Sequence, residues 1–241
     1  MFCCSHLGLG VRGGCEALIH TVRALLEQNE EAEILQVNFI NAFNEADRAI
    51  AFNELKKHFP ELTHLVASCY GVAAHLVYGD TNIPSTTSFH QGDALAVLLF
   101  ALTLQPIILK ILDEVPSLKT NSWFLDDGIL AGTREELVKA VRILLEEGPA
   151  HGLQLSTEHV VPYPGTSKCA LWCGREGPKE TDPLGVGILP IEGPGFVHLG
   201  APVGRWQHSL CTGEGERASA ESPGSPPCSP NLGECPWSLH F

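Results

Sequence analysis

The spacing of the apolar residues changes along this chain, from the period of a helix to that of a strand, and this change constrains the fold most. Residues 16–28 carry apolar side chains at helical spacing. The next segment alternates apolar with polar residues, so that Leu35, Val37 and Phe39 share one face of a predicted strand. A helix and a strand that each have one apolar face need a common core. The sequence therefore predicts a mixed α/β fold.

The order of the later elements narrows the fold further. After the first strand, the patterns predict helices at 45–59 and 62–71, a short strand at 75–79, a helix at 93–115, a hairpin at 123–130, a helix at 133–147, and short strands at 153–156, 168–173, 186–191 and 196–200. Strand, helices, hairpin, helix and strand, in this order, are typical of a split βαβ, ferredoxin-like layer. In that layer the first strand ends beside the hairpin tip, so we expect Asn38 and Asp126 to be neighbours.

Local signals set the ends of two of these helices. Asp93 is the expected N-cap of the long apolar helix, and Pro106 is expected to kink it. Thr133 and Glu136 have the spacing of a capping box, which predicts the start of the helix that runs through Glu147.

Two adjacent carboxylates, Asp126 and Asp127, stand between short apolar runs in "NSWFLDDGILAG". Asp-Gly is a favoured pair at the centre of a two-residue hairpin, so a solvated turn with Asp127 and Gly128 near its tip explains the segment. A metal site is the alternative, because paired carboxylates are ligands for hard cations. The segment alone leaves both explanations open.

Composition and charge limit the classes of function and the number of domains that the chain can have. The chain has 241 residues, of which 44% are hydrophobic, and a formal net charge of −13. A nucleic-acid-binding protein usually carries a basic patch, yet Lys56 and Lys57 are the only adjacent basic pair. We expect one folded domain over residues 1–206. Residues 207–241 are rich in Ser, Pro and Gly, which predicts a disordered tail.

The start of the chain and its cysteines bear on its location. The first residues lack the basic and apolar regions of a secretory signal, so the nine cysteines are expected to be mostly reduced and the protein intracellular, nuclear or cytoplasmic, and not secreted. No membrane partner is expected, because Pro106 and Lys110 interrupt the longest apolar run.

Five segments in one order carry a resemblance to a known family. They are "VNFINAFN" (37–44), "HQGDALAVLLFALTLQP" (90–106), "WFLDDGILAG" (123–132), "GLQLS…SKCALW" (152–172) and "GFVHLGAPVG" (195–204). Together they resemble the reverse transcriptase (RNA-directed DNA polymerase) domain of non-long-terminal-repeat retrotransposons. The resemblance spans residues 7–206 and implies a ferredoxin-like polymerase palm with packed helices. It also implies nucleotidyl transfer on an RNA template and a DNA primer, with Mg²⁺ (or Mn²⁺) as the cofactor.

The resemblance also implies roles for individual residues. Asp126 and Asp127 would be metal ligands, and Lys168 would match a catalytic lysine. Phe43, Gln91 and Gly92 would match positions that contact the incoming nucleotide. A core phenylalanine and a solvated lysine are ordinary alternative explanations for Phe43 and Lys168, and Asp93 and Gly200 have equally ordinary explanations as a helix cap and a turn glycine.

The chain departs from the family at its first strand. The family places a metal-bridging aspartate where this chain has Asn38. An amide oxygen brings no charge, so metal binding is expected to be weak or lost and the two-metal site inactivated. The family's basic fingers motifs and its thumb are also missing from the sequence.

The expected function is therefore that of a retroelement-derived, reverse-transcriptase-like pseudoenzyme whose binding of template and primer is weakened by acidic charge. Three alternatives stay open. One is a weak enzyme that needs fingers from a partner. The others are a non-catalytic scaffold that binds nucleic acid or protein, and a translated retroelement remnant with no selected role.

Overall fold

A five-stranded sheet forms the centre of the computed structural model, which describes residues 5–29, 31–157, 168–174 and 177–204. These residues form a mixed α/β fold with six α-helices. The chain separates into a unit of residues 1–207 and a unit of residues 208–241. The second unit, and with it the predicted tail, lies outside the described residues.

The sheet has the order β4-β5-β1-β6-β7. Its strands are β1 (Glu33–Val37), β4 (Thr120–Phe124), β5 (Asp127–Gly132), β6 (Ala170–Trp172) and β7 (Leu189–Ile191). The central strand β1 is antiparallel to both neighbours, β5 and β6, whereas β7 is parallel to β6. The first predicted strand is thus the central one, which explains why its apolar residues are buried on both faces.

Helices α5 (Ala94–Glu114) and α6 (Arg134–Glu147) cover one face of the sheet. The caps are those that the sequence predicts. The Asp93 carboxylate accepts the Leu95 N–H at 2.9 Å, and Thr133 and Glu136 form the capping box. Leu35 and Val37 pack against these helices, and their alternation therefore sets which face of β1 meets the main core.

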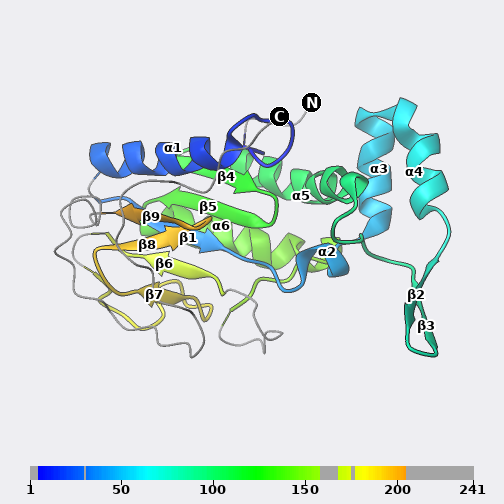
Figure 1. The fold of residues 1–241 in the computed structure, drawn as a ribbon. Helices are drawn as coiled ribbons and strands as arrows, with labels where there is room; N and C mark the ends of the chain where they lie inside the picture. Colours follow the sequence, from blue (N-terminus) through cyan, green and yellow to red (C-terminus); the bar gives the residue numbers. More distant parts are fainter. Residues whose placement is uncertain (1–4, 30, 158–167, 175–176, 205–241) are drawn as a thin grey trace, which may run out of the picture. The chain divides into compact units, whose positions relative to one another are not determined.

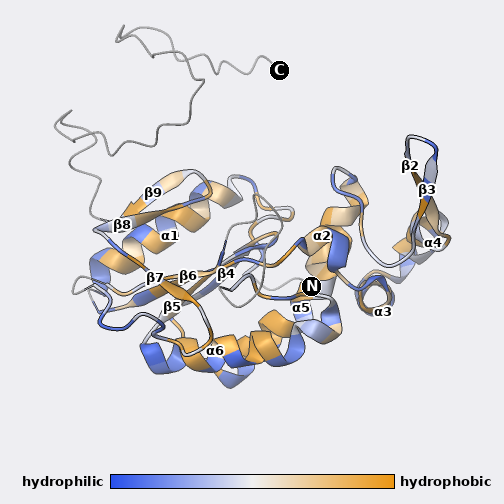
Figure 2. Ribbon diagram, turned by 90° about the horizontal axis from the view of Figure 1, so that it is seen from below, coloured by the Kyte–Doolittle hydropathy of each residue, from blue (hydrophilic) through white to orange (hydrophobic). Residues whose placement is uncertain are grey.

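The other face is covered by α1 (Gly14–Gln28) and by a hairpin of β8 (Gly195–His198) and β9 (Ala201–Gly204). Figure 2 shows these elements and α6 on opposite sides of the strands. Leu18, Val22, Ile34, Ile129 and Phe196 are buried together in this second cluster. The sheet therefore has a core on each side.

A lobe of three helices and a hairpin connects β1 to α5. It consists of α2 (Ala42–Glu45), α3 (Arg48–His58), α4 (Thr63–Tyr70), β2 (Ala74–Tyr78) and β3 (Thr81–Ser85). Short 3₁₀ turns, at Pro60–Leu62 and Pro149–His151, precede α4 and follow α6. In Figure 1 the β2–β3 hairpin stands away from the five-stranded sheet.

Three details of the sequence prediction are wrong. Residues 153–156 form an isolated bridge, between Leu155 and Phe39, instead of a strand. Strand β3 was not predicted, and it contains Pro84, a residue that is uncommon inside strands. The turn between β4 and β5 is Leu125–Asp126, and Asp127 already belongs to β5.

Helix α5 is the one helix of the described residues that is long and apolar enough to cross a membrane. It continues through Pro106 and Lys110, in agreement with the single helix predicted over 93–115. Within its most apolar window, 61% is buried inside the fold. This burial is typical of the central helix of a protein core, and Phe100, Leu104 and Ile108 belong to that core.

Candidate functional site

The hairpin tip is the first component of the candidate site. Phe124 pairs with Asp127, so the two-residue turn consists of Leu125 and Asp126. Leu125 has φ 58°, a backbone conformation in which leucine is rare and costs about 1–3 kcal/mol. The surrounding structure must therefore hold this tip in place.

A glycine next to the tip explains why the turn is not where Asp-Gly preference puts it. The ring of Trp123 lies over Gly128, and a Cβ on Gly128 would come within 2.5 Å of that ring. Trp123 is fully buried and stacks on Phe39 with 5.9 Å between ring centroids. Gly128 is therefore a packing glycine, and this contact between strands places the turn two residues closer to the N-terminus than Asp127–Gly128.

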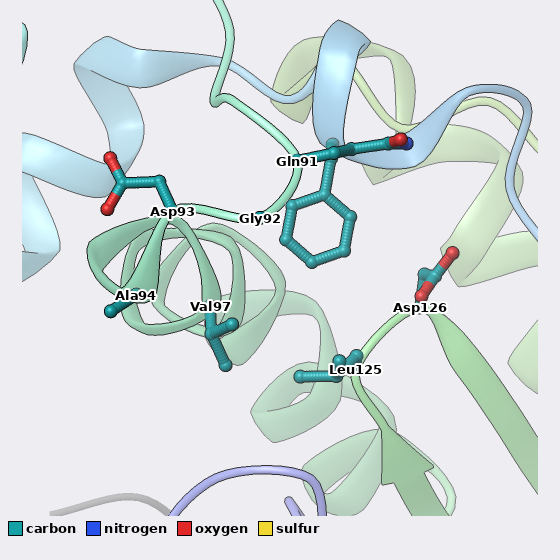
Figure 3. Close-up of a pocket in the computed structure, with 8 residues that line it drawn as sticks. Gln91, Gly92, Asp93, Ala94, Val97, Leu125 and Asp126 are labelled. Carbon is teal, nitrogen blue, oxygen red and sulfur yellow. The ribbon is translucent and has the colours of Figure 1, made fainter.

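A cavity of about 420 Å³ lies between the hairpin tip and the start of α5. Its lining residues come from the region after β1, the loop before α5, the first turns of α5 and the hairpin tip: Phe43, Gln91, Gly92, Asp93, Ala94, Val97, Leu125 and Asp126. Figure 3 shows the Gln91 and Asp126 side chains on one side of the cavity and the Asp93 carboxylate pointing away to the other. Four of the seven sequence-predicted site residues, Phe43, Gln91, Gly92 and Asp126, thus line one cavity.

The wall of the cavity is held by a buried network that the sequence prediction missed. The Tyr70 hydroxyl donates to Asp93 Oδ2 at 2.5 Å, and the Arg48 guanidinium lies over the Tyr70 ring, 5.1 Å from its centroid. Arg48 also donates to the carbonyl oxygens of Ser88 and Tyr70. Burial and the bond to Asp93 raise the pKa of Tyr70 to about 12.

This network fixes the loop that carries Gln91 and Gly92. Phe89 within the loop donates its backbone N–H to the Phe43 carbonyl at 2.9 Å, and the Phe43 ring stacks on Phe100 at 4.6 Å. No local pattern marks Arg48 or Tyr70 as part of a site. The one sequence feature that could have pointed to this network is the arginine itself, Arg48, in the helix predicted over 45–59.

The other three predicted residues are not among those that line the cavity: Asn38 follows β1, Asp127 begins β5 and Lys168 precedes β6. Val37 pairs with Gly128, so Asn38 and Asp127 occupy the next register position across β1 and β5. The Asn38 amide donates to the Lys168 carbonyl at 3.3 Å, and the Cys169 thiol donates to the Asn38 carbonyl at 3.2 Å. Asn38 is thus beside the hairpin, but its described hydrogen bonds go to Lys168 and Cys169 before β6 and to the Ser156 N–H, which donates to the Asn38 carbonyl at 2.9 Å.

The two aspartates are partly withdrawn from water. Burial raises the pKa of the Asp126 carboxyl. Burial, and then the charge of Asp126, raises the pKa of Asp127 to about 6. Both shifts of pKa favour the protonated carboxyl, and a cation bound at either carboxylate would act in the opposite direction.

The residues fit the metal centre of the family only in part. Hard cations need oxygen ligands, and a pair of ions about 3.5–4 Å apart needs several charged ones. Asp126 and Asp127 supply two carboxylates and Asn38 supplies a neutral amide. Within the described part of the chain, no three His, Cys, Asp or Glu side chains gather to hold a metal ion. The described residues therefore do not fit a complete two-ion centre.

Comparison with known proteins does not extend this description. The chain matches no protein-family model and no curated protein. The candidate site therefore depends on the geometry given above.

Proposed function

We propose that this chain is a reverse-transcriptase-like palm that binds a nucleotide in the cavity beside the hairpin tip and has lost efficient nucleotidyl transfer. One observation carries the proposal. Phe43, Gln91, Gly92 and Asp126, which are up to 83 positions apart in the sequence, line the same cavity. The family resemblance alone assigns each of these residues to a nucleotide-contacting or metal-binding position.

The topology supports the same proposal. Strands β4, β5, β1 and β6 have the antiparallel order of a ferredoxin-like layer, with α5 before β4 and α6 after β5 on one face. The end of β1 and the β4–β5 tip are then adjacent, as a polymerase palm requires.

The chemistry of the cavity fits a nucleotide better than a small charged metabolite. The Phe43 ring gives a planar apolar wall, Gln91 gives an exposed amide donor and acceptor, and Asp126 accepts hydrogen bonds. A base and a sugar present the matching flat surface and hydroxyl groups. The family's cations, if bound here, would be held by Asp126 and Asp127 and would neutralise the phosphates.

Titration with a deoxynucleoside triphosphate, followed by calorimetry, tests the proposal. We expect Gln91→Ala to weaken binding by about 5-fold, the equivalent of about 1 kcal/mol for one lost hydrogen bond. Asn53→Ala, an exposed amide on α3 outside the cavity, is the matched control and is expected to leave binding unchanged. Binding that is absent, or insensitive to Gln91→Ala, would contradict the proposal.

A second test examines the departure at Asn38. Asn38→Asp adds a third carboxylate at the register position of Asp127, so Mn²⁺ is expected to raise the melting temperature of the variant more than that of the parent. Without metal, the variant is expected to be slightly less stable, because the new charge repels Asp127. Asn53→Asp adds the same charge elsewhere and is expected to respond to Mn²⁺ like the parent.

A further inference from the structure

The β2–β3 hairpin exposes apolar residues that a folded monomer would normally cover. Five large apolar side chains are exposed between residues 72 and 85: Val72, Leu76, Val77, Tyr78 and Ile83. Val77 is 73% exposed and Tyr78 is 81% exposed. Because side chains alternate along a strand, Leu76, Tyr78 and Ile83 lie on one face of the hairpin and Val77 lies on the other. A contiguous exposed apolar surface, such as that of Leu76, Tyr78 and Ile83, marks an interaction site, whereas single exposed apolar residues need no explanation.

The two edges of this hairpin differ. Pro84 has no N–H, so it can stand opposite His75 only if that pair points its backbone groups away from the hairpin. Hydrogen-bonded and non-hydrogen-bonded pairs alternate along an antiparallel hairpin. The backbone N–H and C=O groups of the pair Val77 and Asn82 therefore also point outward. The outer edge of β3 therefore lacks a donor at Pro84, while the outer edge of β2 offers the N–H and C=O groups of both His75 and Val77.

The charges of residues 72–85 differ from those of the rest of the chain, and this difference bears on which partner the hairpin can bind. The chain has a net charge of −13, so two copies repel each other over most of their surfaces. Residues 72–85 contain one acidic residue, Asp80 at the turn, and no lysine or arginine. A second copy can approach this surface without meeting like charge, and the absence of basic residues disfavours nucleic acid here.

We infer that two copies of this chain associate through their β2 strands, which pair antiparallel about a two-fold axis to form a four-stranded sheet β3-β2-β2-β3. An antiparallel pair of identical strands is an isologous interface, which closes at two subunits. The outer edges of that sheet are the β3 strands, where Pro84 blocks further pairing. The inference does not depend on the proposed function, because it uses no residue of the cavity.

The size of the surface indicates the strength of the association. The hairpin contributes the 14 residues from 72 to 85, whereas a standard interface has about 20–30 residues a side. We therefore expect a weak dimer, with a dissociation constant on the order of micromolar.

Sedimentation of the full chain over a range of concentrations, with a reducing agent present to prevent disulfides, measures this association. We expect a monomer–dimer equilibrium without larger species. Val77→Pro removes an outward N–H from β2 and is expected to weaken the dimer at least about 10-fold. Asn82→Pro, at the paired position on β3, is the matched control, because it alters only the edge that Pro84 already blocks, and is expected to leave the dimer intact.

A second variant and a second measurement keep the test decisive if Val77→Pro disturbs the hairpin. Val77→Lys places two like charges across the two-fold axis, so its dimer is expected to be weaker at low salt and to recover partly at high salt. Amide exchange should show protection of His75 and Val77 that increases with protein concentration. A chain that stays monomeric, or a dimer that Val77→Pro and Val77→Lys leave unchanged, would overturn the inference. So would amides that become protected only when a single-stranded oligonucleotide is added.

Discussion

The packed body and the β2–β3 hairpin contain the same kinds of residue in opposite surroundings. Leu130 on β5 is fully buried, whereas Leu76 on β2 is 48% exposed. Tyr70 is buried at the end of α4, whereas Tyr78, eight positions later, is almost fully exposed. Both regions form strands of apolar residues. The difference shows that local preference makes a strand, while the neighbours decide whether its side chains stabilise the fold.

The largest predicted effect contrasts the two leucines. Leu130→Ala removes a side chain from the centre of the sheet, opposite Leu35, and is expected to lower the free energy of unfolding by about 3 kcal/mol. Leu76→Ala is expected to cost about 0.5 kcal/mol or less. Denaturant unfolding measures both losses, at a protein concentration low enough that the hairpins of two copies do not pair. Equal losses would mean that the hairpin is packed against a part of the fold.

A smaller effect contrasts two histidines. Burial lowers the pKa of His198 to about 4, and its Nδ1 lies 3.2 Å from the Gln36 amide nitrogen. A group with a lowered pKa stabilises the fold fully above its unfolded value of about 6.5, and this stability is lost as the pH falls toward 4. Between about pH 7 and about pH 5 we expect a loss of about 1–2 kcal/mol through His198.

The variant His198→Gln is expected to reduce this pH dependence. His75→Gln, on the exposed strand β2, is expected to leave it unchanged. Unfolding curves at several pH values measure the difference. A pH dependence that is the same in His198→Gln as in the parent would mean that protonation of another group destabilises the protein in acid.

The smallest effect contrasts the two tyrosines. Tyr70→Phe removes the hydroxyl that donates to Asp93 and is expected to cost about 1 kcal/mol. The same change is expected to raise the pKa of Asp93, because the bond from Tyr70 is the main cause of its lowered value. Tyr78→Phe is expected to alter neither quantity. Carboxyl titration by NMR, together with unfolding, separates a lost bond from a general loss of packing.

Local sequence signals determined the elements where short-range preferences agreed. The capping box at Thr133, the N-cap at Asp93 and the alternation through Leu35 and Val37 each depend on residues within a few positions of one another. For the same reason the hairpin at 123–130 was predicted correctly as a hairpin. Its tip was not, because the Asp-Gly preference lost to the packing of Trp123 over Gly128.

The candidate site shows the same division. The family resemblance selected Phe43, Gln91, Gly92 and Asp126 by their positions in motifs, and these residues share a cavity. The buried Arg48–Tyr70–Asp93 network was not predictable, since its members are 22 to 45 positions apart and no short pattern connects them.

The sequence by itself determined the kinds and order of the elements, the absence of a carboxylate at Asn38, and the acidic charge of the chain. Only the tertiary structure decided which apolar surfaces are covered, where the hairpin turns, and that β2 presents an open edge while Pro84 blocks that of β3. The physical reason is range. Propensity, capping and charge act between near neighbours in the chain, whereas burial and packing depend on residues that only the fold brings together.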